Sequence, residues 1–286
     1  MPERVEIQEV GPRDGLQNEA VAIPAAVKIA LIDLLSDTGL SRIEATSFVS
    51  PKWVPQLADA EAVMAGIRRA PGVRYAVLVP NLAGFQRAQQ CRPDEIAVFA
   101  SASEGFSRKN INCTIDESLA RFAPVFEAAR EAAIPVRGYV SCVTDCPYDG
   151  PVAPASVARV TDALLKAGAF EVSLGDTIGH GTPETVAAML RAVLDVAPAN
   201  RLAGHFHDTR GRALDNIGTC LDLGLRVFDA SVGGLGGCPY APGASGNVAT
   251  EAVARYLKTR GYETGIDLDR LDTAARFIRD ALANAA

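Results

Sequence analysis

The stretch LAGHFHD, residues 202–208, combines a strand-like alternation with two of the three histidines in a chain of 286 residues. Side chains two positions apart in a strand point to the same face, so His205 and His207 project together. Gly204 and Phe206 then point to the opposite face, which we expect to be covered by helices. The stretch predicts a β-strand that ends in a pair of imidazoles.

Seven further short β-rich runs occur along the chain, and most are followed by an Ala- and Leu-rich amphipathic segment. They are VEIQEVG (5–11), RIEATSFV (42–49), YAVLVP (75–80), EIAVFAS (95–101), VRGYVSC (136–142), FEVSLGD (170–176) and VFDASVGG (227–234). Strands that alternate with helices pair in parallel, and eight such units over about 250 residues are typical of a (β/α)8 TIM barrel. We therefore predict one barrel domain over residues 1–286, with residues 251–286 as a C-terminal helical extension.

Several helix boundaries are marked in the sequence. Pro24 begins one helix that ends at Gly39, and Thr182 precedes another. Thr114 begins a third with a capping box, and Pro124 inside that helix predicts a kink or a break.

An open doubly wound sheet is the alternative fold. Such sheets usually carry a Gly-rich phosphate-binding turn after the first strand. The segment GPRDGLQNE (11–19) matches neither the dinucleotide-binding fingerprint nor the P-loop, which favours the barrel.

Composition and charge narrow the functional classes. The chain is 48% hydrophobic, with a formal net charge of −6 at pH 7, so we expect no nucleic-acid partner. Its six cysteines contain no CxxC pair, which favours free thiols in a reducing cytoplasm. We expect no signal peptide and no membrane span, and hence a cytoplasmic protein.

The barrel fold makes a demand that the sequence can test, because the active sites of such barrels lie at the C-terminal ends of the strands. Polar and ionisable residues do collect there in the predicted barrel. They are Arg13 and Asp14 after the first strand, Glu44 in the second, Asp176 after the sixth, His205 and His207 at the seventh, and Cys238 in a Gly-rich loop after the eighth.

These positions allow a metal site. Barrel closure puts the first strand two places from the seventh, roughly 10 Å away at a spacing of ~4.8 Å, so Asp14 can reach both histidines. The loop after the eighth strand passes between them and can supply Asn247. A mixed oxygen and nitrogen set of this kind suits Mg²⁺ or Mn²⁺, although imidazole also binds Zn²⁺, Co²⁺ or Fe²⁺. Two histidines and a carboxylate also form the facial triad of non-haem iron oxygenases.

Six motifs identify a resemblance to the hydroxymethylglutaryl-CoA lyase family, within the superfamily of barrel lyases and Claisen-type synthases. The superfamily's metal motifs are similar to RDGLQ (13–17) and HFHD (205–208). The lyase family itself is similar to EVGPRDGLQNE (9–19), TSFVSPKWVPQ (46–56), SLGDTIGHGTP (173–183) and GLGGCPYAPGASGN (234–247). The resemblance implies metal-dependent cleavage of 3-hydroxy-3-methylglutaryl-CoA to acetyl-CoA and acetoacetate, a step of leucine and ketone-body catabolism.

The resemblance also implies roles for residues of the site. Asp14, His205, His207 and Asn247 bind the cation, and Cys238 moves a proton at the acetyl-CoA carbon. Arg13 is suited to stabilise a developing oxyanion, although an ion pair with Glu44 explains it as well.

Further residues are expected around this centre. Glu44 and Asp176 act either as the base or by orienting their neighbours. The remaining substrate-binding candidates are Gln17, Glu251, Lys52, Arg108 and Lys109, the last three for the phosphates of CoA. We expect a homo-oligomer, a dimer. Glu251 is equally explained as an acid in the first turn of a helix.

Several functions compete with this interpretation. A related lyase would accept a longer substituent at C3, and a synthase would join an acyl-CoA to a 2-oxo acid with the same barrel motifs. An iron oxygenase is disfavoured by the βα repeat, and a non-catalytic binding protein by the number of reactive groups at one rim.

Overall fold

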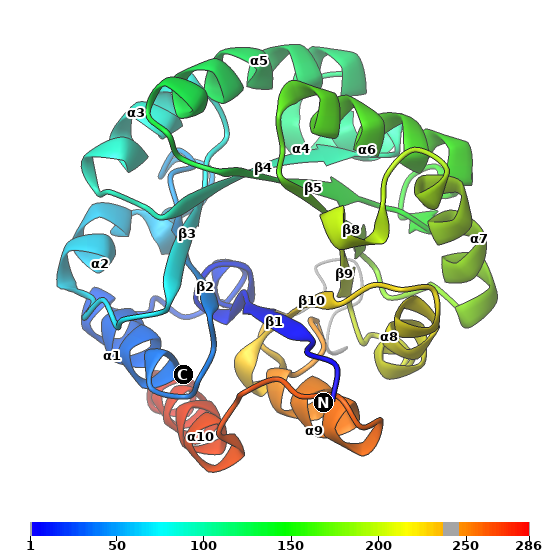
Figure 1. Ribbon diagram of the computed structural model, residues 1–286. Coiled ribbons are helices and arrows are strands. Elements are labelled where there is room, and N and C mark those ends of the chain that lie inside the picture. Colours follow the sequence, from blue (N-terminus) through cyan, green and yellow to red (C-terminus); the bar gives the residue numbers. More distant parts are fainter. Residues whose placement is uncertain (1, 237–245, 286) are drawn as a thin grey trace.

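Eight parallel strands form a closed barrel that is surrounded by helices (Figure 1). The computed structural model describes residues 2–236 and 246–285. In barrel order the strands are β1 (Glu6–Glu9), β10 (Val227–Ala230), β9 (Leu202–Phe206), β8 (Glu171–Asp176), β5 (Val136–Ser141), β4 (Glu95–Ser101), β3 (Arg74–Leu78) and β2 (Arg42–Ser47). Strand β2 pairs with β1 and closes the ring, so the predicted (β/α)8 barrel is confirmed.

Helices follow the strands around the outside of the barrel (Figure 1). They are α1 (Ala25–Ser36), α2 (Ala60–Gly66), α3 (Leu82–Gln90), α4 (Glu104–Ile111), α5 (Ile115–Glu131), α6 (Pro154–Ala167), α7 (Pro183–Leu194), α8 (Ala213–Asp222), α9 (Thr250–Thr259) and α10 (Leu268–Ala285). A small hairpin of β6 (Asp145–Cys146) and β7 (Gly150–Pro151) follows β5 and was not predicted.

Helix α5 runs through Pro124 without the break that its sequence predicts. Its start is as expected, since Thr114 forms a capping box with Glu117. Proline costs a helix interior about 3 kcal/mol, whereas each buried Phe or Val contributes roughly 1.5–3 kcal/mol. Burial of Phe122, Val125 and other residues on the barrel side of α5 therefore outweighs the local cost.

The C-terminal part of the chain is helical, as expected. Helix α9 follows β10 and takes the place of the eighth barrel helix, so the extension consists of α10 alone. Helix α10 packs beside α1 (Figure 1), where Nη1 of Arg270 donates to the carbonyl of Asp37 at 3.0 Å.

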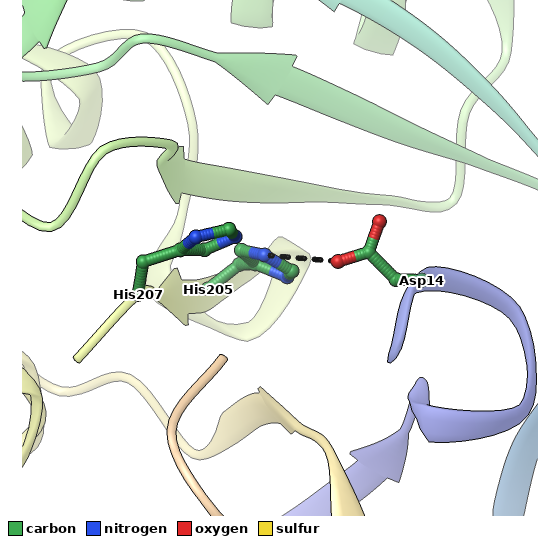
Figure 2. Close-up of side chains that lie close together, drawn as sticks. All are labelled: Asp14, His205 and His207. Carbon is green, nitrogen blue, oxygen red and sulfur yellow. Dashed lines mark ion pairs between the residues drawn. The ribbon is translucent and has the colours of Figure 1, made fainter. Parts of the chain in front are cut away.

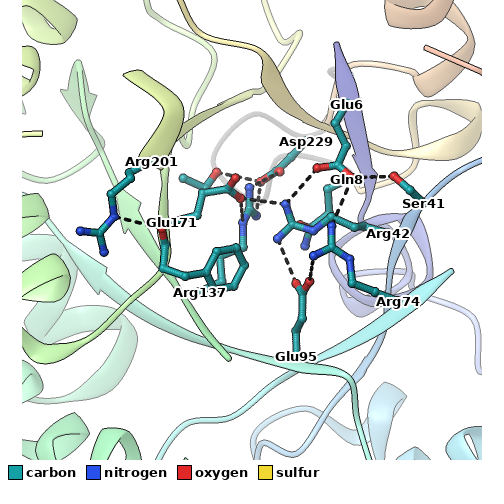
Figure 3. Close-up of polar contacts among 12 residues, drawn as sticks. Glu6, Gln8, Ser41, Arg42, Arg74, Glu95, Arg137, Glu171, Arg201 and Asp229 are labelled. Atoms are coloured by element: carbon teal, nitrogen blue, oxygen red, sulfur yellow. Dashed lines mark hydrogen bonds and ion pairs between the residues drawn. The ribbon is translucent and has the colours of Figure 1, made fainter. Parts of the chain in front are cut away.

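The strands separate two different environments. Outside the strands, apolar side chains fill the layer between sheet and helices. Inside, at the N-terminal ends of the strands, buried Arg42 and Arg137 pair with Glu95 and Glu171 (Figure 3). The C-terminal ends of the strands are left open for the site.

Candidate metal and substrate site

Asp14, His205 and His207 converge at the C-terminal mouth of the barrel (Figure 2). Each offers one ligand atom, and these three atoms lie within 4.8 Å of one another. Oδ2 of Asp14 is 3.9 Å from Nε2 of His205, and the two imidazole centroids are 5.5 Å apart. The prediction that Asp14, after the first barrel strand β1, reaches the two histidines at the end of the seventh barrel strand, β9, is confirmed.

A π-helical turn at residues Gly11–Gly15 positions Asp14. The first strand ends at Glu9, two residues earlier than its sequence predicts, and the carbonyl of Val10 then accepts from the amides of Asp14 and Gly15 at 2.7 and 3.2 Å. Wide turns of this kind occur frequently at functional sites. Here the turn bends the chain over the barrel mouth and directs Asp14 toward β9.

The end of β9 is held by the segment that contains Asn247. His207 forms a single antiparallel bridge with Asn247, and the amide of Asp208 donates to the carbonyl of Gly246 at 2.7 Å. Nδ2 of Asn247 donates to Oδ2 of Asp14 at 2.8 Å. The four predicted metal-binding residues are therefore brought together, with the amide nitrogen of Asn247 facing Asp14.

Gly236 is required for this arrangement. Its φ is +98°, and a Cβ built on it would lie 2.8 Å from Nδ2 of Asn247 and 3.3 Å from the carbonyl oxygen of Asp14. Both the backbone conformation and the space exclude a side chain at this position.

Arg13 makes the ion pair with Glu44 that the sequence allowed. Its Nε donates to Oε2 of Glu44 at 2.7 Å, and its Nη1 contacts the carboxylate of Asp14. The hydroxyl of Tyr139 donates to the same Oε2 at 3.2 Å. Burial raises the pKa of Glu44, although the charge of Arg13 opposes the shift.

The carboxylate of Asp176 accepts three hydrogen bonds from neighbouring groups. Oδ1 accepts from Thr144 Oγ1 at 2.9 Å and from the amide of His180 at 3.3 Å, and Oδ2 accepts from the amide of Gly181 at 2.9 Å. Burial raises the pKa of Asp176. These contacts fold the loop after β8, so Asp176 orients this loop, and its carboxylate keeps a further lone-pair site.

The site is suited to hold a divalent cation. Nδ1 of His207 is buried and makes no hydrogen bond within the described residues, an arrangement that costs free energy unless another group binds it. Burial lowers the pKa of His207 to about 4, so the ring is neutral, as a metal ligand must be. Burial opposes ionisation of Asp14, but the charge of Arg13 in particular lowers its pKa to about 2.

A cavity of about 940 Å³ opens above these residues. Its volume is at the upper end of the range for small-molecule sites. Arg13, Asp14, His205 and His207 lie among its lining residues, and an apolar wall is formed by Leu78, Phe99 and other side chains. Toward the mouth the lining includes the following polar or exposed residues: Gln17, Asn18, Trp53, Lys109, Asn110, Asn112 and Arg121.

Only some of the predicted substrate-binding residues line the cavity. Gln17 and Lys109 line the cavity. Lys52 is exposed beside it, and Arg108 pairs with Glu104 at 3.8 Å on the surface of α4.

A further candidate, Glu251, lies away from the cavity. Oε2 of Glu251 accepts from the amide of Gly233 at 2.8 Å, so this residue holds the segment after β10. Cys238 lies outside the described residues. The other five cysteines are free thiols, as expected.

Sequence reasoning missed several ionisable residues beneath the site. Asp229 and Arg137 form a buried ion pair below His205, and Glu9 accepts from the amides of Gly11 and Val232. Asp229 and Arg137 stand in largely apolar strands, where a charged residue was the signal available. Glu9 carried no such signal, because its strand also contains Glu6 and Gln8.

A family model and a curated relative both match nearly the whole chain, including the residues of the site. A family model described as HMGL-like matches residues 4–278. A Gallus gallus protein named hydroxymethylglutaryl-CoA lyase, mitochondrial, is 57% identical over 281 residues, 98% of this chain and 94% of that protein.

Solved structures are similar over nearly the whole chain. An HMG-CoA lyase from Brucella melitensis is 65% identical with a TM-score of 0.97, covering 98% of this chain and 99% of the other. An HMG-CoA lyase from Acinetobacter baumannii, in complex with coenzyme A and 3-methylmalate, is 40% identical with a TM-score of 0.93, covering 98% and 92%.

Proposed function

The chain belongs to the HMGL-like family, and on this premise we propose that it cleaves 3-hydroxy-3-methylglutaryl-CoA to acetyl-CoA and acetoacetate with the aid of a divalent cation. The observation that carries the proposal is the convergence of Asp14, His205 and His207 on the lining of one large cavity. The similarity to lyases over nearly the full chain favours cleavage over the synthase reaction.

Cleavage of the C2–C3 bond needs a base and an acid. The base takes the proton of the C3 hydroxyl, the bond electrons pass to the thioester as an enolate, and a proton is then delivered to C2. When bound, the cation would supply Lewis acidity that acidifies the hydroxyl and polarises a neighbouring carbonyl. Asp14, His205 and His207 would hold it, with Asn247 as the proposed fourth residue.

Arg13 is the residue of this chain best placed to stabilise negative charge. Its guanidinium is buried at the cavity, and Glu44 and Asp14 fix its orientation through ion pairs. A positioned donor of this kind contributes on the order of 3 kcal/mol to the stabilisation of an oxyanion. Glu44 does not line the cavity, so we assign it the positioning of Arg13.

Proton delivery to C2 is assigned to Cys238 on the family resemblance alone. Asp176 is the remaining candidate for the base that takes the C3 hydroxyl proton, because its carboxylate accepts three hydrogen bonds and keeps a further lone-pair site. Variant Cys238→Ala is expected to retain the cation and to lose turnover. Air oxidation is expected to inactivate the wild type, with recovery in dithiothreitol.

The cavity mouth is suited to coenzyme A. Lys109 and Arg121 bring positive charge to the lining of a protein that is acidic overall, and exposed Trp53 offers an aromatic face. Phosphate groups and an adenine ring are complementary to these side chains. The Acinetobacter baumannii relative with coenzyme A bound supports an acyl-CoA as the substrate class.

The resident cation is proposed to be Mg²⁺ or Mn²⁺, because oxygen ligands of Asp14 and Asn247 accompany the imidazoles. A cytoplasmic location and a homodimer also remain parts of the proposal. Among residues 2–236 and 246–285, no helix is long and apolar enough to span a membrane.

A coupled assay for acetoacetate tests the proposed function. Protein treated with EDTA is expected to be inactive, and Mg²⁺ or Mn²⁺ should restore production of acetoacetate from 3-hydroxy-3-methylglutaryl-CoA. Absence of acetoacetate with either ion, together with release of free CoA from acetyl-CoA and a 2-oxo acid, would instead identify a synthase.

A further inference from the structure

Asp229 of β10 lies directly beside His205 of β9 inside the barrel. The two residues are partners in the register of these neighbouring strands. Phe228 and Ala230 belong to the apolar layer under the helices, so strand alternation turns Asp229 inward. Its side chain is completely buried, and its Oδ2 lies 3.2 Å from Nδ1 of His205.

The other polar contacts of Asp229 among the described residues come from donors. Arg137 donates from Nη2 to Oδ1 at 2.8 Å and from Nη1 to Oδ2 at 3.1 Å, and Ser173 Oγ donates to Oδ2 at 2.7 Å. A carboxylate paired with a guanidinium in this bidentate way is ionised and can only accept hydrogen bonds. Nδ1 of His205 therefore carries a proton and donates it.

We propose that Asp229 is a positioning residue that fixes His205 in the tautomer with a protonated Nδ1 and so keeps the lone pair of Nε2 available to the cation. The inference rests on the metal site of the proposed function. Nε2 is the ring atom on the side of Asp14, at 3.9 Å from Oδ2. A carboxylate behind a metal-binding histidine typically contributes 10–100-fold to metal affinity.

Asp229 is itself anchored from the opposite end of the barrel. Nε of Arg137 donates to Glu171 at 2.7 Å, Glu171 also accepts from Arg42, and Arg42 donates to Glu95 at 2.9 Å (Figure 3). This series of buried ion pairs holds the carboxylate in place whether or not the cation is bound.

The substitution Asp229→Ala tests the tautomer by removing the acceptor of Nδ1. Oδ2 accepts from His205, Ser173 and Nη1 of Arg137, so an asparagine would keep its carbonyl oxygen there and leave the tautomer unchanged. With alanine, the groups left beside Nδ1 are the donors of Arg137 and Ser173, which favour a proton on Nε2 instead. The lone pair that the cation needs would be lost without removal of any ligand.

Glu95→Ala is the matched control. Glu95 is a buried carboxylate of the same series of ion pairs, but its contacts are with Arg42 and Arg74. It has the same change in charge and a comparable effect on folding, without contact with His205. A merely structural role of Asp229 would make the two variants alike.

Two measurements give the result. Nitrogen-15 NMR of the ring atoms is made on metal-free protein at pH 8.5, with the three histidines assigned by His180→Gln and His207→Gln. Mn²⁺ affinity is measured by electron paramagnetic resonance. Asp229→Ala should move the proton of His205 to Nε2 and raise the Kd for Mn²⁺ by about 10–100-fold, whereas Glu95→Ala should keep the wild-type tautomer and a Kd within about twofold.

Either of two results would overturn the inference: a wild-type spectrum with the His205 proton on Nε2, or an equal loss of Mn²⁺ affinity in both variants. The wild-type spectrum requires no substitution, so a variant that does not fold leaves the test decisive. Neither measurement uses the acyl-CoA, so failure of the proposed cleavage is detected separately in the acetoacetate assay.

Discussion

Oδ2 of Asp14 lies 3.9 Å from Nε2 of His205, across the mouth of the barrel. Asp14 follows β1 and His205 belongs to β9, two strands that are far apart in the sequence. The contact exists because β10 is the only strand between β1 and β9 in the ring. Both groups are held before any cation binds, Asp14 by Arg13 and Asn247 and His205 by Asp229. Preorganisation of this kind reduces the free energy that binding must spend on ordering the ligands.

Loss of one imidazole should abolish tight binding of the cation. His207→Ala removes a neutral, buried ligand and leaves Asp14 and His205 in place. We expect the Kd for Mn²⁺ to rise by more than about 100-fold, beyond the effect of an outer residue, as measured by isothermal titration calorimetry. An unchanged Kd would mean that His207 does not bind the ion.

Gly236→Ala should weaken the same site from behind. The added Cβ would displace Asn247 or Asp14, and the residue would also be strained at positive φ, at about 1–2 kcal/mol. Gly72→Ala is the control, because Gly72 has φ +81° but open space around it. We expect both variants to lose stability in thermal unfolding, Gly236→Ala more because of its added contacts, and Gly236→Ala alone to lose Mn²⁺ affinity. Equal affinities would contradict the assigned contact.

Arg13→Lys should be nearly as inactive as Arg13→Gln. Lysine keeps the charge, but its single ammonium cannot reproduce the simultaneous contacts of the guanidinium with Asp14 and Glu44. We expect kcat to fall on the order of 10²–10³-fold in both, with binding of the acyl-CoA retained. A lysine variant with wild-type kcat would show that the reaction needs only the positive charge of Arg13, not its two contacts.

Glu9 should make stability depend on pH. Burial raises its pKa to about 7, against hydrogen bonds from Thr250 and two backbone amides that lower it. The folded protein then binds more protons than the unfolded chain between pH 4.5 and 7, so stability falls as pH rises through this window.

The variant Glu9→Gln isolates this effect, because it lacks the titrating proton. The difference in unfolding free energy between wild type and variant should shift by about 3 kcal/mol against the wild type between pH 4.5 and pH 8. Urea unfolding at several pH values measures the shift, and a difference independent of pH would show that Glu9 does not titrate in that range.

The sequence was sufficient for the strands and for the residues at their ends. Period-two alternation and strand-end position located Asp14, His205 and His207, because barrel geometry carries such residues to one rim. The residues beneath the rim could not be placed in the same way. Whether Asp229 meets His205 depends on strand register, which alternation alone does not fix.

Contacts between helix residues and loop backbone could not be predicted from the sequence either. Glu251 follows Asn247 closely in sequence, yet it binds the amide of Gly233, because the first turn of α9 directs it away from the cavity. Glu251 thus takes the place that was the alternative from the sequence, an acid in the first turn of a helix. Burial of a whole helix face decided the continuity of α5, where Pro124 predicted a kink or a break. In α5, tertiary packing overrides local preference.

Anomalous diffraction from crystals soaked in Mn²⁺ shows whether Asp14, His205 and His207 bind a cation. We expect one strong peak at the barrel mouth, bound by these three residues at about 2.0–2.3 Å. A peak at another place, or none at saturating Mn²⁺, would contradict this expectation.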